Sequence, residues 1–132
     1  MSDAERADGE RTIAEAAARH PELTLLVLFG SRARGDARRG SDWDLGYLAG
    51  ASFNVDGLLA DLVTELGTED IDLVDLAHAG AVLRYRAARD GQRLFGADGT
   101  FERFCFEAIT FWCDIEPVLA AGYADVLAEL DS

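Results

Sequence analysis

The segment that decides the fold covers residues 23–48 and reads LTLLVLFGSRARGDARRGSDWDLGYL. Residues 23–29 are a short, nearly continuous apolar run, which is typical of a strand buried on both faces. Gly30 ends this run, and the polar residues 31–41 favour a connection with room for one short helical turn. Residues 42–48 have the pattern of a second strand, so the sequence predicts two strands joined by a polar connection.

The rest of the chain alternates between helical and strand-like patterns. Helices are expected at residues 3–20, 55–66, 80–90 and 100–130. Further strands are expected at residues 70–76 and 92–95. Pro117 should kink or split the last helix near Glu116. This order predicts an α/β fold in which a small mixed sheet of three or four strands is packed with helices and is followed by a C-terminal helix.

Length and charge narrow the class of protein. The chain has 132 residues, which is typical of one domain, and it carries 25 acidic against 12 basic residues, a net charge of -13. This excess disfavours a surface that grips nucleic-acid phosphates, because such surfaces gather Lys and Arg. It favours a basic partner or cations held between carboxylates. The sequence has neither an apolar run of membrane length nor a signal-peptide pattern, so a cytoplasmic protein without membrane contact is expected.

Carboxylates gather at the second and third expected strands. Asp42 and Asp44 point to the same face because side chains alternate along a strand, and their Cα atoms are about 6–7 Å apart. Such a pair repels itself unless a cation lies between the two groups, and hard oxygen ligands favour Mg²⁺. Asp70 and Asp72 share one face of the third strand and Asp75 lies on the other. If the strands are neighbours, Asp72 completes a three-carboxylate cluster suited to phosphoryl transfer by one or two metal ions.

The turn after the first strand offers groups that bind anions. Gly30 and Ser31 present backbone N–H groups and a hydroxyl at the start of a turn. Arg32 and Arg34 can neutralise phosphates. Each of these features alone is common on protein surfaces, but the combination after a buried strand is much more specific.

The combined pattern resembles the nucleotidyltransferase signature of the DNA polymerase beta superfamily. The signature is Gly30-Ser31, ten residues, and then Asp42-Trp43-Asp44, and the surrounding residues are similar to the minimal nucleotidyltransferases, the MNT branch. The resemblance covers residues 23–96. It implies a single minimal nucleotidyltransferase domain over residues 1–132, with a core at 23–96 and a C-terminal helical segment at 100–130.

The resemblance also implies roles for individual residues. Asp42, Asp44 and Asp72 would be the catalytic and metal-binding carboxylates of a site that holds Mg²⁺, with two ions expected. The nucleotide-binding residues would be Gly30, Ser31, Arg32 and Arg34, which would hold the triphosphate of ATP as substrate. Two departures from the family pattern are the bulky Trp43 between the aspartates and the pair Gly46-Tyr47 in the strand that follows. Neither departure removes a ligand, but both could change the packing behind the site.

Many MNT proteins are the antitoxin of a HEPN/MNT toxin–antitoxin pair, and the resemblance implies transfer of AMP from ATP to a tyrosine of a HEPN ribonuclease toxin. A hetero-oligomer with that toxin is expected, since the chain is short and acidic and an RNA-binding toxin would expose a basic surface. The last helix is apolar on more than one face, with Phe111 and Trp112 as candidate anchors for a partner. The alternative is a helix wedged between the sheet and the N-terminal helix.

Other functions remain open at this point. A nucleotidyltransferase that modifies a small molecule such as an aminoglycoside would need an acidic cleft, and this chain is acidic. A degenerate fold that only binds and blocks a toxin would need no catalytic residues, and the intact Gly30, Ser31, Asp42, Asp44 and Asp72 oppose that interpretation. A nucleic-acid polymerase or binding module is disfavoured by the net charge.

Overall fold

The computed structural model describes residues 3–34 and 42–131, with the side chains of the last helix described as far as Ile115. Its helices are α1 (Asp3–Ala17), α2 (Gly30–Arg34), α3 (Val55–Leu66), α4 (Ala81–Asp90) and α5 (Thr100–Asp131). Its strands are β1 (Leu23–Phe29), β2 (Trp43–Ala49), β3 (Ile71–Asp75) and β4 (Gln92–Gly96). The predicted alternation of helices and strands is confirmed, and the bounds of the expected elements shift by at most three residues.

The four strands form one mixed sheet in the order β3-β2-β1-β4. Strand β1 pairs antiparallel with both β2 and β4, while β2 pairs parallel with β3. The central position of β1 explains its continuous apolar sequence, because a central strand with helices on both sides buries every side chain. Six of its seven residues are buried, and only Thr24 is exposed.

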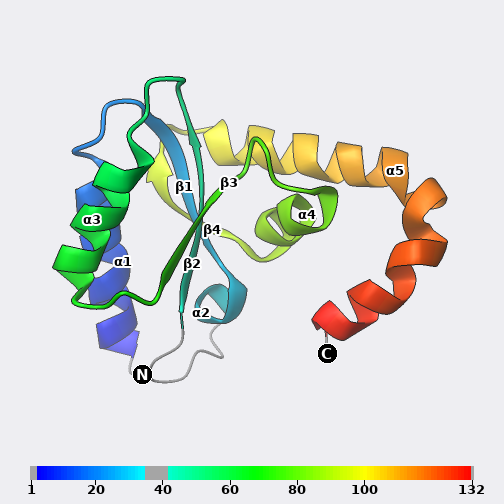
Figure 1. The fold of residues 1–132 in the computed structure, drawn as a ribbon, viewed down its shortest axis with the longest axis horizontal. Coiled ribbons are helices and arrows are strands. Elements are labelled where there is room, and N and C mark those ends of the chain that lie inside the picture. Colours follow the sequence, from blue (N-terminus) through cyan, green and yellow to red (C-terminus); the bar gives the residue numbers. More distant parts are fainter. Residues whose placement is uncertain (1–2, 35–41, 132) are drawn as a thin grey trace.

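The helices cover both faces of the sheet (Figure 1). Helices α1 and α3 pack on one face, where the core includes Ile13, Leu26 and Leu62. Helices α4 and α5 pack on the other face, around Val27 and Phe104. Alternate residues of β1 therefore serve two separate cores. The alternative position for α5, between the sheet and α1, is wrong, because α1 and α5 lie on opposite faces.

Helix α3 shows how local sequence signals set an element. Its N-cap is Asn54, whose side chain accepts a hydrogen bond from the N–H of Gly57 at 3.0 Å. Leu58 and Leu62 are one turn apart and fully buried. Gly67 ends the helix in the left-handed region, with φ of 69°, and its N–H bonds the carbonyl of Val63.

Helix α5 has two kinds of apolar residue. Phe104, Ala108 and Trp112 are buried, and the ring of Trp112 stacks on Tyr85 of α4 at 5.2 Å between centroids. Trp112 therefore belongs to the core, and its role as a partner anchor is wrong. The exposed large apolar side chains on this helix are Phe106, Ile109 and Phe111, at 72%, 43% and 42% exposure.

Pro117 does not split α5, which is a single helix over 32 residues. Figure 1 shows that the helix axis turns sharply in its second half, as expected for a kink at proline. Within the part of the chain that the structure describes, no helix is both long enough and apolar enough to cross a membrane.

Candidate functional site

The site begins where β1 passes into α2. Phe29, the last residue of β1, pairs with Asp44 of β2, so Gly30 follows directly beside that aspartate. Gly30 has a φ of +75°, a conformation that favours glycine. A Cβ atom at this position would overlap with Oδ2 of Asp44 and lie 3.1 Å from its Cγ. The glycine therefore allows both the turn and the close approach of the backbone to the carboxylate.

The predicted carboxylates lie on neighbouring strands. Asp44 and Asp72 are direct partners in the parallel pairing of β2 with β3, so they lie side by side on one face of the sheet. Asp42 precedes β2 by one residue and is exposed, while Asp44 is partly buried. The two strands still pair near Asp42, since the N–H of Trp43 donates to the carbonyl of Asp70 at 2.9 Å. The expected juxtaposition of Asp72 with Asp44 is thus present in the backbone.

Asp75 belongs to the other end of β3. Its carboxylate accepts hydrogen bonds from the N–H of Ala77 and bonds Nδ1 of His78 at 2.7 Å. Asp75, His78 and Tyr47 line a pocket of about 240 Å³ at this end of the sheet. Burial, and the negative charge of Asp75, raise the pKa of Tyr47. This pocket is remote from Gly30 and Asp44, so it is a separate feature of the molecule.

Arg32 is the one buried charged residue among the described side chains, at 5% exposure. Its guanidinium carbon lies 4.0 Å from the ring centroid of Trp43. Burial lowers the pKa of Arg32, and the charges of Asp42 and Asp44 act in the opposite direction. Arg32 therefore places a cation beside the carboxylates. The protein covers most of this side chain, and its predicted role in neutralising phosphates stays a prediction.

Trp43 is accommodated by a glycine that the sequence analysis did not single out. A Cβ atom on Gly9 of α1 would lie 2.6 Å from Cη2 of the Trp43 ring. The indole thus packs directly against the α1 backbone while Arg32 covers it from another direction. The other departure from the family pattern has a similar cause, because a Cβ atom on Gly46 would lie 2.7 Å from Cδ2 of Leu76. Both departures are compensated by packing and leave the carboxylates in place.

A divalent cation needs several oxygen ligands close together. Across residues 3–34 and 42–115, no three His, Cys, Asp or Glu side chains come close enough together to hold a metal ion. The donor set is nevertheless chemically suitable, because Asp42, Asp44 and Asp72 offer only hard carboxylate oxygens. The missing Cβ of Gly30 lets the Asp44 carboxylate lie directly against the backbone of the turn. The side chains of Ser31 and Arg34 lie outside the described part of the structure.

The chain is similar to proteins of a known family. Residues 11–100 match the family described as polymerase beta, nucleotidyltransferase. The match covers more than half of the chain, which therefore belongs to this nucleotidyltransferase family. The family resemblance and the fold predicted from the sequence are confirmed.

Two curated relatives are similar to the chain, and both are named protein adenylyltransferase MntA. The relative from Aphanizomenon flos-aquae is 34% identical over 98 residues, which cover 64% of this chain and 65% of that protein. The chain thus spans just under two thirds of the length of this relative. The relative from Shewanella oneidensis is 32% identical over 112 residues, which cover 82% of this chain and 79% of that protein.

Solved structures share the fold over nearly the whole chain. A toxin–antitoxin crystal structure with AMP-PNP contains a chain that is 30% identical, with a TM-score of 0.75, covering 89% of this chain and 98% of that one. A structure of a tri-AMPylated Shewanella oneidensis HEPN toxin in complex with MNT antitoxin contains a chain that is 27% identical, with a TM-score of 0.71. That match covers 92% of this chain and 98% of the other.

Proposed function

We propose that this chain is a Mg²⁺-dependent adenylyltransferase that transfers AMP from ATP to a tyrosine hydroxyl of a HEPN-type toxin and thereby neutralises it. The observation that carries the proposal is the pairing of Asp44 with Asp72, directly beside the turn at Gly30. The relatives named protein adenylyltransferase and the neighbouring toxin–antitoxin complexes support the choice of AMP and of a toxin as acceptor.

The carboxylates of the site have separate roles in the proposed reaction. The acceptor hydroxyl oxygen attacks the α-phosphorus of ATP, a new P–O bond forms, the bond to the β-phosphate oxygen breaks, and pyrophosphate leaves. Asp72 is exposed and lies next to Asp44, so it can take the proton of the hydroxyl. Mg²⁺, held by Asp42, Asp44 and Asp72, would neutralise the phosphates and align the attack.

The turn at α2 holds the triphosphate in this proposal. Backbone N–H groups at Gly30 and Ser31 lie at the start of a helical turn, where anions are stabilised. Arg32 contributes positive charge next to Asp42 and Asp44, and Arg34 remains a candidate phosphate ligand. We therefore keep Gly30, Ser31, Arg32 and Arg34 as the nucleotide-binding set.

Two interactions would bind the toxin: electrostatic attraction and the burial of exposed apolar side chains. The net charge of -13 gives long-range attraction to a basic partner, and this attraction weakens with salt. Phe106, Ile109 and Phe111 are exposed apolar side chains of α5 that a partner can cover. The docked toxin, more than a deep pocket for one side chain, would then determine which tyrosine is modified.

Co-expression of this chain with a HEPN toxin encoded by a neighbouring gene tests the proposal. The toxin should gain one or more adenylyl groups, measured as intact mass, when ATP and Mg²⁺ are present. The gain should disappear in EDTA, because the carboxylates and the polyphosphate repel each other without a cation. If the two proteins form a complex but the toxin mass never changes, the chain is a non-catalytic blocker and the proposal is wrong.

Replacing Gly30 by alanine should damage nucleotide binding more than it damages the fold. The matched control is Gly67→Ala, because Gly67 has a φ of +69° but no atom within 4 Å of an added Cβ. Left-handed strain should lower the free energy of unfolding by about 1–2 kcal/mol in both variants. Only Gly30→Ala also pushes a methyl group into the Asp44 carboxylate.

We expect calorimetry with Mg²⁺ and an ATP analogue to show clearly weaker binding to Gly30→Ala than to the native chain, and near-native binding to Gly67→Ala. Equal binding by both variants would mean that the contact between Gly30 and the Asp44 carboxylate is not part of the nucleotide site.

A further inference from the structure

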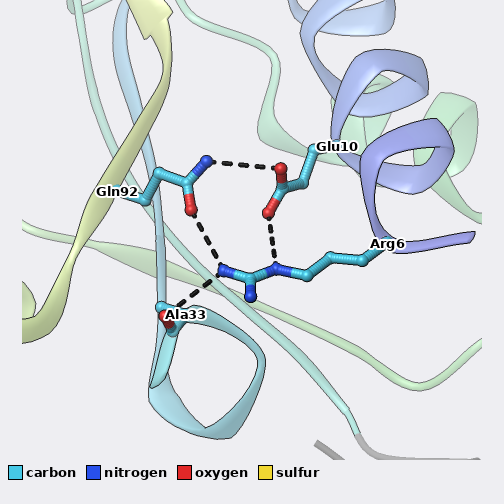
Figure 2. Close-up of polar contacts among 4 residues, drawn as sticks. All are labelled: Arg6, Glu10, Ala33 and Gln92. Carbon is cyan, nitrogen blue, oxygen red and sulfur yellow. Dashed lines mark hydrogen bonds and ion pairs between the residues drawn. The ribbon is translucent and has the colours of Figure 1, made fainter. Parts of the chain in front are cut away.

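The side chain of Arg6, on α1, forms hydrogen bonds to residues of α1, α2 and β4 (Figure 2). Its Nε donates to Oε1 of Glu10 at 3.1 Å. Its terminal nitrogen donates to the carbonyl of Ala33 in α2 and to the side-chain oxygen of Gln92 in β4, both at 3.3 Å. Gln92 in turn donates to the other oxygen of Glu10 at 3.3 Å, which closes the network. A single guanidinium thus connects α1, α2 and β4.

The contact with Ala33 bears directly on the turn that carries Gly30, Ser31 and Arg32. Helix α2 is only one turn long, and the carbonyls at the end of a helix have no partner within it. Arg6 supplies such a partner from outside. The Arg6 and Glu10 side chains are 31% and 17% exposed, so solvent competes less for them than for an ordinary surface ion pair.

The same helix supports the other side of the site. Gly9 lies one turn after Arg6 and contacts the ring of Trp43, which carries the guanidinium of Arg32. Helix α1 therefore holds the turn through Ala33 and supports Trp43 between the two aspartates. Another arginine of α1 behaves differently, since Arg11 pairs with Asp8 at 2.7 Å on the exposed side of the helix.

We infer that Arg6 is a positioning residue for the nucleotide site: it fixes the α2 turn in the orientation that receives the triphosphate. Arg6 acts through the Ala33 carbonyl and the Glu10–Gln92 network. This inference rests on the proposed function, because it takes α2 as the phosphate-binding turn.

Binding of an ATP analogue with an uncleavable methylene bridge between its α- and β-phosphates, measured by calorimetry with Mg²⁺, tests the inference without any acceptor. Arg6→Ala should weaken the affinity about fivefold to tenfold, the effect of losing one or two hydrogen bonds that order the turn. Arg11→Ala, which removes an exposed pair from the same helix, should stay within about twofold. Arg6→Lys should be intermediate, since an ammonium keeps the charge but lacks the planar fork that reaches several acceptors.

A merely structural role would lower the melting temperature of Arg6→Ala and leave its affinity unchanged at a temperature where the variant is folded. That result overturns the inference and leaves the proposed function intact. If Arg6→Ala does not fold, Gln92→Leu, which removes one arm of the network, takes its place with the same expectation of weaker binding. Failure of the native chain to bind the analogue with Mg²⁺ would overturn the inference together with the nucleotide site on which it rests.

Discussion

Asp44→Asn should reduce transfer of AMP by about a thousandfold or more, because loss of a metal-binding carboxylate removes several kcal/mol of transition-state stabilisation. Asparagine keeps the size and shape of the side chain beside Gly30, removes its charge and replaces one acceptor oxygen by an NH2 donor. The rate of mass gain by the toxin, followed at saturating ATP, measures the effect. Transfer within tenfold of the native chain would place the metal-binding group elsewhere.

The fold of the variant should survive, since two opposing electrostatic effects partly cancel. Removing the charge at position 44 relieves repulsion with Asp42 and Asp72, and it also removes attraction to the buried Arg32. We expect the melting temperature to change by only a few degrees. Asp98→Asn is the matched control, because the Asp98 side chain is fully exposed, lies far from the site in sequence and pairs with Arg93 at 3.3 Å. It should retain full activity.

The elements could be predicted from sequence because strong local signals mark them. The apolar run of β1 and the boundaries of α3, with Asn54 and Gly67 at its ends, agree with the expected residues. The sequence predicts that helix α1 reaches residue 20, but the helix ends at Ala17, and the N–H groups of Arg19 and His20 bond three positions back. Alanine periodicity does not show where a helix tightens into a final turn ahead of Pro21.

The position of α5 could not be read from its sequence. Its apolar residues predicted contacts on more than one face, but which of them pack depends on where α4 lies, as the stacking of Trp112 on Tyr85 shows. Periodicity reports that a face is apolar and does not report what covers it. The exposure of Phe106, Ile109 and Phe111 could be recognised only in three dimensions.

The candidate site, too, could be predicted from the sequence only in part. Spacing along the chain predicted Gly30, Asp42 and Asp44 as candidates, and strand alternation favoured Asp72, which pairs with Asp44 in the structure. The burial of Arg32 under Trp43 and the network of Arg6 were missed, because both depend on contacts between residues far apart in the chain. The one available signal was Gly9, a glycine inside a helix, which often marks a close packing contact.

Asp72→Asn should lower the rate of AMP transfer by about a hundredfold to a thousandfold, the range expected when a general base is lost. Asp75→Asn should leave the rate within about threefold, because an odd spacing from Asp72 puts it on the opposite face, at the pocket with His78. The two variants change one charge each on the same strand, so they form a matched pair. Single-turnover mass measurements with the toxin compare them directly.

Asp70→Asn is a third variant for the comparison of Asp72→Asn with Asp75→Asn. Asp70 shares the face of Asp72, and its carbonyl accepts the N–H of Trp43. Asp70 lies before β3, about 7 Å along the strand from Asp72, and is level with Asp42 rather than with Asp44. Its carboxylate is therefore further from the space beside Gly30, and we expect at most a modest loss, about tenfold or less. A loss larger for Asp70→Asn than for Asp72→Asn would mean that the third carboxylate lies one step earlier on the strand, opposite Asp42. The attacking hydroxyl would then have to approach from the end of the sheet, and the assignment of Asp72 as proton acceptor would be wrong.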